Sequence, residues 1–197
     1  ASNIICIISC QVSLISTMRT RRCVTLSWMW PGSGLTAVLT DMEEMKNQIE
    51  KEFGNPKVVC LNAGVGFGSS ISEATIRDWE WVVGVNLWGV VNGLCTFLPD
   101  IKKMGEGHIV MTSSIAGHIS VPNLGPYSAT KFAVVSIAET LRQELLAENS
   151  KVGVSCLCPG FVSTNIWDSE RNRPENLLNN SGDESTDEEF LRHCASY

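Results

Sequence analysis

The segment "KVVCLNAGVGFGSS", residues 57–70, joins a short apolar run to a stretch rich in glycine and serine. Residues 57–61 form an apolar run of strand length, which predicts a buried strand. The glycines and serines that follow predict a tight turn and a loop. A buried strand of this kind is typical of a parallel sheet, whose strands are enclosed on both faces.

Helices and strands are predicted to alternate on either side of this segment. The predicted elements are a β-like run at 35–39, a helix at 40–53 capped by Thr40 or Asp41 and closed by Gly54, a helix at 75–104 that tolerates Gly84, Gly89 and Gly93, a strand at 108–114, a helix at 126–149 and a strand at 152–158. This alternation predicts an α/β fold in which helices cover both faces of a parallel sheet.

Small and polar residues follow three of the predicted strands at the point where each strand ends. They are Asn62-Ala63-Gly64, Ser113-Ser114 and Pro159-Gly160. Because right-handed crossovers bring the carboxyl ends of parallel strands to one edge, these residues are expected to lie together. Ligands bind at that edge in open α/β sheets.

Tyr127 and Lys131 lie one helical turn apart in "GPYSATKFAVV", residues 125–135. A phenol titrates near pH ~10, and a neighbouring ammonium would lower its pKa toward the pH at which proton transfer is effective. The pair therefore suits an acid/base device. An ordinary helix face would show the same spacing.

Five short motifs occur in a fixed order: "LNAG" (61–64), "VNLWG" (85–89), "TSSIAG" (112–117), "YSATK" (127–131) and "PGFVST" (159–164). In this order, with Ser114 thirteen residues before Tyr127, they resemble the short-chain dehydrogenase/reductases of the classical type. The resemblance covers about residues 34–168 and implies a Rossmann-like, doubly wound parallel sheet.

The resemblance also implies an NAD(P)-dependent oxidoreductase that interconverts an alcohol and a carbonyl. The implied catalytic residues are Asn86, Ser114, Tyr127 and Lys131. Tyr127 would be the general acid/base, Ser114 would hold the substrate oxygen, Lys131 would also bind the nicotinamide ribose, and Asn86 would help hold a water. Asn62, Ala63 and Gly64 would approach the adenine ribose, while Pro159, Gly160, Val162 and Thr164 would meet the nicotinamide amide and the pyrophosphate.

The same resemblance gives weaker indications. It favours NADP slightly over NAD, a small-molecule substrate and a homo-oligomer. It assigns no role to His108 or His118, which are expected to be structural. Trp79, Trp81 and Trp88 are expected to serve packing or an interface.

The sequence departs from the family at both ends. The glycine-rich TGxxxGxG turn is absent, "PGSG" (31–34) lacks its spacing, and no second strand is recognisable. The acidic residue expected before the next helix is shifted to Asp41 or replaced by Val38.

We therefore expect a chain truncated at both ends, with residues 1–33 outside the native fold and 169–197 forming a polar lid or tail. "NIICIIS" (3–9) is apolar enough to replace the first strand. The alternative function is an inactive fragment or binding scaffold.

Bulk composition limits the remaining possibilities. The chain has 197 residues, 44% of them hydrophobic, which suffices for one domain, and its net charge of −6 disfavours nucleic acid. Eight scattered cysteines indicate a reduced, cytoplasmic compartment, and no spacing suggests a metal site. The apolar N-terminal run is shorter than the ~20 residues of a membrane span, and its positive charges follow it, so neither a membrane nor an export role is expected.

Overall fold

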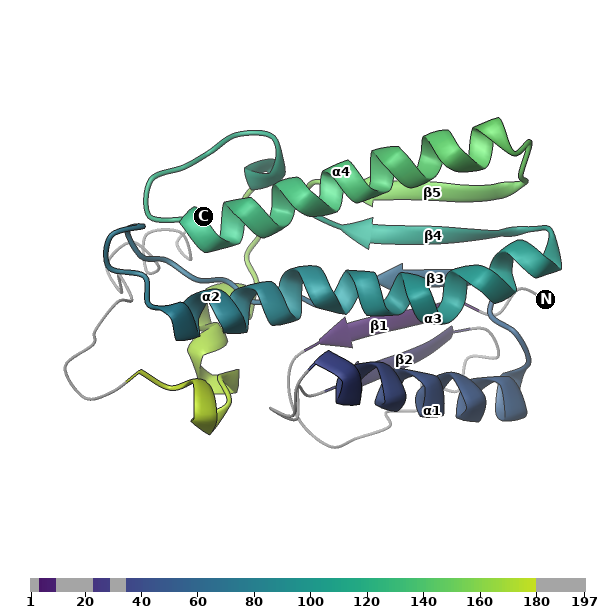
Figure 1. The fold of residues 1–197 in the computed structure, drawn as a ribbon, viewed down its shortest axis with the longest axis horizontal. Coiled ribbons are helices and arrows are strands. Elements are labelled where there is room, and N and C mark those ends of the chain that lie inside the picture. The colour runs from purple at the N-terminus through teal and green to yellow at the C-terminus, as the bar shows by residue number, and fades with distance from the viewer. Residues whose placement is uncertain (1–3, 10–22, 29–34, 180–197) are drawn as a thin grey trace.

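The computed structural model describes residues 4–9, 23–28 and 35–179. In these residues five strands form one parallel sheet in the order β2-β1-β3-β4-β5. The strands are β1 (Ile4–Ser9), β2 (Cys23–Trp28), β3 (Val58–Leu61), β4 (Gly107–Thr112) and β5 (Val152–Leu157). Figure 1 shows the helices lying against one face of this sheet. The predicted α/β class with a parallel sheet is confirmed, whereas helices were expected on both faces and the described residues place the long helices on one.

The first strand lies inside the sheet. β1 pairs with β2 on one side and with β3 on the other, so residues 4–9 of the apolar run 3–9 supply the first strand, as the sequence suggested. The second strand, which was not recognisable in the sequence, is β2 at the sheet edge. Its sequence "CVTLSW" alternates Val24, Leu26 and Trp28 with Thr25 and Ser27, and this period of two was the available signal.

Helix α1 (Leu35–Phe53) is longer than predicted. The β-like run at 35–39 is wrong, since these residues form the first turns of the helix. Leu35, Leu39 and Met42 step by four and three residues, so they continue the helical period of the predicted segment. Gly54 ends the helix with a φ of +75°, a left-handed conformation that favours glycine.

The long helix predicted at 75–104 is present in three parts. They are α2 (Ile76–Val83), a π-helical segment (Gly84–Trp88) and α3 (Gly89–Met104). Thr75 and Asp78 form a capping box that fixes the start of α2. Gly105, with a φ of +75°, ends α3. The π segment is the feature that sequence periodicity did not indicate, and such segments often occur at functional sites.

The stretch Ile76–Met104 is also long and apolar enough to cross a membrane by length and composition. Half of its most apolar window is buried inside the protein. Val90, Phe97 and Ile101 from this stretch are almost fully buried and belong to the main core. A core helix of a globular domain passes the same test of length and hydropathy.

The last regular elements match their predicted ranges closely. β4 is followed by α4 (Gly125–Ala147), and α4 leads into β5. Pro126 lies in the first turn of α4, where its missing N–H costs nothing. Beyond β5 the chain forms two short 3₁₀ segments, Asn165–Asn172 and Glu175–Leu177.

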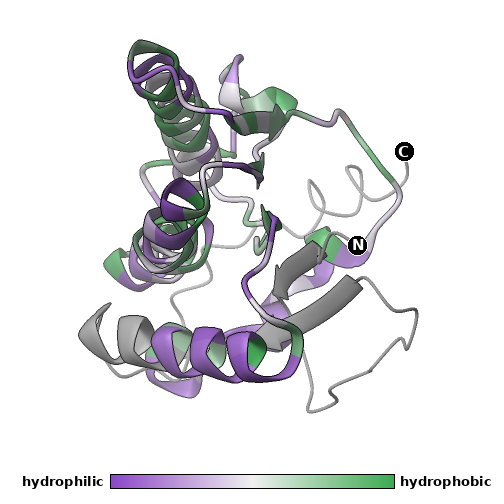
Figure 2. Cartoon of the chain, turned by 90° about the vertical axis from the view of Figure 1, so that its right-hand side faces the viewer, coloured by the Kyte–Doolittle hydropathy of each residue, from purple (hydrophilic) through white to green (hydrophobic). Residues whose placement is uncertain are grey.

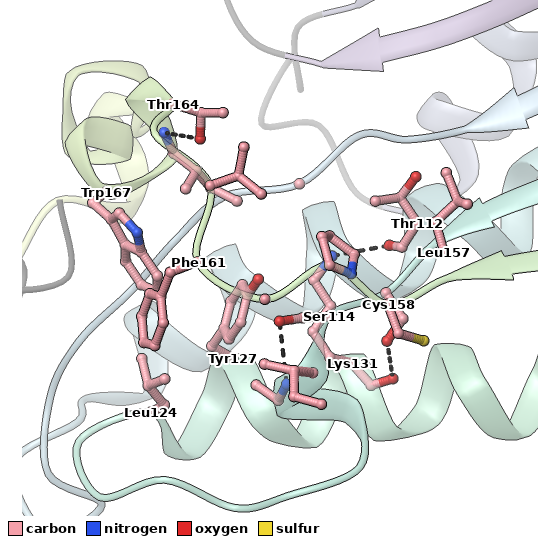
Figure 3. A pocket seen from close by; sticks show the side chains of 18 of the residues that line it. Thr112, Ser114, Leu124, Tyr127, Lys131, Leu157, Cys158, Phe161, Thr164 and Trp167 are labelled. Carbon is pink, nitrogen blue, oxygen red and sulfur yellow. Dashed lines mark hydrogen bonds between the residues drawn. The ribbon is translucent and has the colours of Figure 1, made fainter. Parts of the chain in front are cut away.

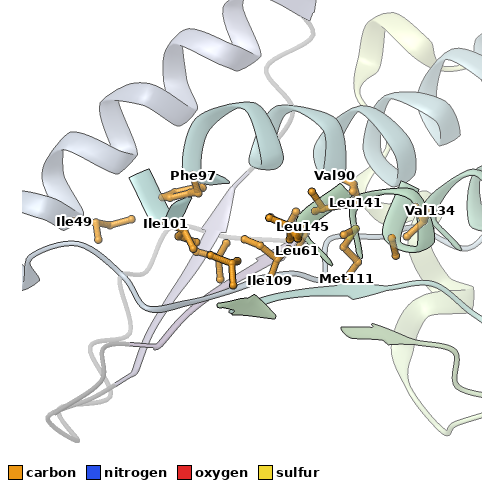
Figure 4. Packing of buried hydrophobic residues seen from close by; sticks show 13 residues of the cluster. Ile49, Leu61, Val90, Phe97, Ile101, Ile109, Met111, Val134, Leu141 and Leu145 are labelled. Atoms are coloured by element: carbon orange, nitrogen blue, oxygen red, sulfur yellow. The ribbon is translucent and has the colours of Figure 1, made fainter. Parts of the chain in front are cut away.

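The hydrophobic core lies between the sheet and one layer of helices. α1, α3 and α4 lie on the same face of the sheet (Figures 1 and 2). On that face the buried strand residues are Val59, Leu61, Ile109 and Met111, and Figure 4 shows them meeting side chains from the three helices. Val58, Cys60 and Val110 point to the opposite face and are half-buried. No described residue forms a long helix there.

The topology places a crevice at the carboxyl ends of the strands. The chain passes from β1 outward to β2 and then crosses back to β3, so the strand order reverses between β1 and β3. In open α/β sheets the loops at such a switch point enclose the ligand site. The loops after β3, β4 and β5 carry the residues singled out by the sequence.

Candidate active site

Tyr127 and Lys131 lie on the buried face of α4, near its start. Their side chains are 5% and 2% exposed. The Lys131 Nζ lies 5.5 Å from the centre of the Tyr127 ring, and it donates a hydrogen bond of 3.1 Å to the Thr112 carbonyl at the end of β4. The predicted pair is therefore anchored to the strand edge (Figure 3).

Ser114 meets Tyr127 from the loop after β4. It caps the short 3₁₀ turn Ile115–Gly117, and its Oγ accepts from the Ala116 N–H at 3.2 Å. The Tyr127 side chain lies close to this hydroxyl, and both side chains line the same pocket. The structure thus brings together three of the four residues predicted to be catalytic, from a loop and a helix that the sheet topology places side by side.

The pKa values correct one expectation. Burial raises the pKa of Tyr127 above its ordinary value, and the neighbouring Ser114 hydroxyl offsets this in part. The prediction that Lys131 lowers the pKa of Tyr127 is wrong for this structure. The Lys131 Nζ lies over the face of the ring and bonds to Thr112, and burial lowers its own pKa to about 8.

Asn86, the fourth predicted residue, lies in the π segment and is 1% exposed. Its Oδ1 accepts from the Val65 N–H at 2.8 Å, and its Nδ2 donates to the Val65 carbonyl at 3.0 Å. Nδ2 also lies 3.3 Å from the Thr130 hydroxyl on α4. The side chain therefore fixes the loop after β3 against α4. Its role in holding a water remains a prediction.

The predicted cofactor residues meet the catalytic ones in one pocket of about 840 Å³. Those that line it are Asn62, Gly64, Pro159, Gly160, Val162 and Thr164, together with Ser114, Tyr127 and Lys131. Ala63 is not among the lining residues. Asn62 is held in place by the Thr112 hydroxyl at 2.8 Å, and the Pro159 carbonyl accepts from the Ile115 N–H at 2.8 Å.

Two glycines keep this pocket open. A Cβ on Gly64 would lie 3.4 Å from the Lys131 Nζ and 3.5 Å from the Asn86 Oδ1, whereas one on Gly160 would meet nothing within 4 Å. The backbone can therefore approach a bound molecule closely. Lys131 has three N–H donors and gives one to Thr112, so further donors face the pocket.

Trp167 is the pocket residue that sequence reasoning missed. It lies in the first 3₁₀ segment after β5, and its ring centre is 5.8 Å from that of Tyr127. It belongs to a cluster with Leu124 and Ile166. Periodicity could not reveal Trp167, because a single aromatic residue in a polar stretch forms no repeating pattern. The only sequence signal for its burial was that it stands among polar neighbours.

The segment that carries Trp167 is tied to the protein at two points. The Gly66 N–H donates to the Ile166 carbonyl at 3.2 Å and to the Ser169 hydroxyl at 3.0 Å. Further along, Arg173 forms a buried ion pair with Asp78 on α2, with 2.5 Å between Nη2 and Oδ1. Its guanidinium lies 5.1 Å from the Trp81 ring centre. Residues 165–179 therefore form an anchored wall, although 169–197 was predicted as a lid or tail.

The histidines and acidic residues suggest no other chemistry. His108 is bonded to Ser155 across β4 and β5 at 2.8 Å, a structural contact as expected. Within residues 4–9, 23–28 and 35–179 no three His, Cys, Asp or Glu side chains gather as a metal site would require. The arginines at 19, 21 and 22 lie outside the described residues.

The parallel sheet reverses its strand order between β1 and β3, and a serine, a tyrosine and a lysine lie at its carboxyl edge. This combination is typical of a class of nucleotide-dependent oxidoreductases. Residues 34–175 match the family model described as short chain dehydrogenase, and the chain belongs to that family. The resemblance drawn from the five motifs is confirmed.

The chain is similar to several known members. It is 41% identical over 114 residues to the oxidoreductase named SadH of Mycobacterium tuberculosis, covering 58% of this chain and 41% of that protein. It is 37% identical over 153 residues to the C alpha-dehydrogenase of Sphingobium sp., covering 73% and 50%. The chain thus spans about half the length of these relatives.

A solved structure gives the same result at the level of the fold. The short chain dehydrogenase/reductase from Burkholderia phymatum, crystallised in complex with NAD, superposes with a TM-score of 0.81 at 36% identity. The match covers 92% of this chain and 64% of that one.

Proposed function

We propose that this chain is an NAD(P)-dependent oxidoreductase that interconverts an alcohol and a carbonyl compound in the pocket beside Tyr127. The observation that carries the proposal is the gathering of Ser114, Tyr127 and the buried Lys131 amine, which lies 5.5 Å from the centre of the Tyr127 ring. All three side chains face one cavity, whose other lining residues include Gly64 and Gly160.

The residues present fit the nicotinamide half of a dinucleotide. Gly64 and Gly160 leave room for a flat ring and its ribose, and Lys131 has donors to offer to ribose hydroxyls. A bound nicotinamide would supply or accept the hydride. Asn62, Pro159, Val162 and Thr164 would contact the same cofactor. The solved relative that contains NAD supports a nicotinamide cofactor, and the slight preference for NADP stays a prediction.

The chain's own groups would handle the oxygen and its proton. Ser114 would hold the substrate oxygen with its hydroxyl and stabilise negative charge there. Tyr127 would donate the proton when a carbonyl is reduced and accept it when an alcohol is oxidised. Lys131 lies over the ring face rather than at the phenol hydroxyl, so its proposed part is to bind the ribose of the cofactor.

Titration with NADH and NADPH tests the proposal directly, with tryptophan fluorescence as the signal. Binding in the micromolar range supports an enzyme. If neither cofactor binds, the alternative of an inactive binding scaffold gains support, since the glycine-rich phosphate turn is absent from the sequence. The homo-oligomer implied by the resemblance and the cytoplasmic location indicated by the cysteines remain predictions.

Two substitutions then separate catalysis from binding. Tyr127→Phe is expected to lower kcat by at least about 100-fold with little change in cofactor affinity. Ser114→Ala is expected to lower kcat by roughly 100-fold. The matched control is Ser128→Ala, which removes a buried hydroxyl on α4 that has no hydrogen-bond partner among the described residues. Equal losses in Ser114→Ala and Ser128→Ala would overturn the role of Ser114.

A further inference from the structure

The wall of the pocket on the Tyr127 side is apolar. Ala116, Leu124 and Tyr127 form a buried cluster against which Val121, Ile166 and Trp167 pack. These residues come from the loop after β4, the start of α4 and the segment after β5. Figure 3 shows Leu124 and Trp167 on the same side of the pocket as Tyr127. A molecule whose oxygen is held at Ser114 would therefore contact this wall through apolar atoms.

Aromatic rings dominate this wall. The Trp167 and Tyr127 rings are tilted by 49° with centres 5.8 Å apart, which is an ordinary aromatic contact. Phe161 lines the same pocket and is 54% exposed, and Ile119 at its mouth is 53% exposed. Such exposed apolar side chains around a concave site are typical of a surface that a ligand covers.

The charged groups of the pocket are already engaged. Among the described residues no carboxylate lines it, and the cations that do are Lys131 and Arg171. Arg171 is paired with Asp168 at 2.7 Å and donates to the Asn165 carbonyl at 3.1 Å. Lys131 is buried beside the proposed nicotinamide site. Thus the wall offers no uncommitted cation for a substrate carboxylate or phosphate.

We propose that the substrate is an uncharged alcohol or ketone whose reacting carbon carries an aromatic or alicyclic ring packed against Trp167. This inference rests on the proposed function. In the oxidation, the C–H hydride passes to the nicotinamide cofactor and the O–H proton to the Tyr127 phenolate, which leaves a C=O bond. The ring itself takes no part in the bond changes and contributes only burial.

Four alcohols separate ring from charge. 1-Phenylethanol has a ring and no charge, mandelate has a ring and a carboxylate, 2-butanol has neither, and lactate has only the carboxylate. Burying a phenyl ring corresponds to a gain of roughly 30- to 100-fold. Hence the kcat/KM for 1-phenylethanol is expected to exceed that for 2-butanol by this factor. It is expected to exceed the kcat/KM for mandelate by at least the same factor. Equal or higher values for lactate or mandelate would overturn the substrate class.

Substitution of Trp167 tests the wall itself. Trp167→Ala is expected to lower kcat/KM for 1-phenylethanol roughly tenfold more than kcat/KM for 2-butanol, and Trp167→Phe should retain most of the preference. The control is Trp88→Ala, which removes an indole that does not line the pocket. A loss of preference in the Trp88 variant equal to that in Trp167→Ala would contradict the assignment.

Binding without turnover distinguishes the two hypotheses. Saturation-transfer NMR of 1-phenylethanol and mandelate reports whether the ring contacts the protein when no reaction occurs. If neither cofactor binds but 1-phenylethanol does, and Trp167→Ala abolishes its signal, the proposed function fails and the ligand class stands. If a cofactor binds and 2-butanol is turned over as well as 1-phenylethanol, the proposed function stands and the ligand class fails.

Discussion

Arg173 and Asp78 form an ion pair that is closed to solvent, with side chains 2% and 0% exposed. The carboxylate is further bound by Thr75 at 2.8 Å and by Asn179 at 3.1 Å. The pair thus joins the start of α2 to the segment that bears Trp167, about a hundred residues later in the chain. It positions one wall of the pocket from a distance.

Asp78→Asn is expected to release this wall. Removing the Asp78 charge leaves the buried Arg173 guanidinium with only the partly exposed Glu170 as an ion partner. Breaking a buried pair costs up to about 3–5 kcal/mol, which the chain avoids by letting residues 165–179 detach. Trypsin should then cut after Arg171 at least about tenfold faster. Asp100→Asn is the matched control, because it breaks the partly exposed pair with Lys46 at no expected cost to the segment. Equal cleavage of both variants would show that the ion pair does not hold the wall.

The buried Lys131 should make stability depend on pH. Burial lowers its pKa from 10.5 to about 8 in the folded chain. Between pH 8 and 10.5 the unfolded chain still holds a proton that the folded chain has released, so the free energy of unfolding rises with pH through that window. Below pH 8 the buried charge costs roughly 3 kcal/mol.

Lys131→Met removes this cost. At pH 7 the variant is expected to unfold with a higher free energy than the natural chain, and the difference should shrink as the pH rises from 8 to 10.5. Tyr127, Cys156 and Cys158 lie near Lys131 but are present in both chains. Urea denaturation at several pH values measures the difference. Lys102→Met, at an exposed lysine paired with Glu148, should give a difference that stays flat, and a flat difference for Lys131→Met would contradict the prediction.

Sequence patterns identified the parts of this molecule that repeat with a period. The strands at 57–61 and 152–158 and the helix at 126–149 were predicted because burial selects apolar residues at fixed spacing. The error at 35–39 arose where Thr and Val, residues with strand preference, begin a helix whose later turns supply the packing. β2 was missed because six residues between arginines and tryptophans gave too short a pattern.

The positions of the site residues were predictable where the spacing of the motifs determines which strand end or helix start bears them. Ser114, Tyr127 and Lys131 meet because a strand end and a helix start lie at one sheet edge. The direction of the pKa change of Tyr127 was not predictable, since it depends on whether Lys131 points at the hydroxyl or over the ring. Trp167 and Arg173 were not predictable either, because their partners Tyr127 and Asp78 lie far away in the sequence.

Asn86→Ala is expected to loosen the loop after β3. It leaves the Val65 N–H and carbonyl without their buried partner, at about 1–3 kcal/mol for each group. Urea denaturation should register the loss, and hydrogen exchange at the Val65 amide should accelerate. Asn92→Ala is a close control, because Asn92 is also buried on the same helical stretch and its Nδ2 has no partner among the described residues. Similar destabilisation by both variants would refute the proposed anchoring.

Two glycines in the same loop should respond differently to the same substitution. Gly64→Ala places a methyl group 3.4 Å from the Lys131 Nζ, an ordinary contact, so stability should change by less than about 1 kcal/mol. The methyl group occupies space assigned to the cofactor, and the Kd for NADH or NADPH, whichever binds, should rise about tenfold or more. Gly66→Ala would instead bring its Cβ to 2.6 Å from the Ile166 carbonyl and push away the segment that carries Trp167.

The Gly66 variant should therefore be cut faster by trypsin after Arg171 and lose stability, while its cofactor affinity changes less than that of the Gly64 variant. Fluorescence titration and proteolysis on the two proteins measure these effects side by side. The opposite pattern, with Gly66→Ala impairing cofactor binding and Gly64→Ala releasing the segment, is incompatible with the proposed placement of the cofactor. That placement puts the ribose of the dinucleotide beside the Lys131 Nζ, and the methyl group of Gly64→Ala would lie 3.4 Å from that atom.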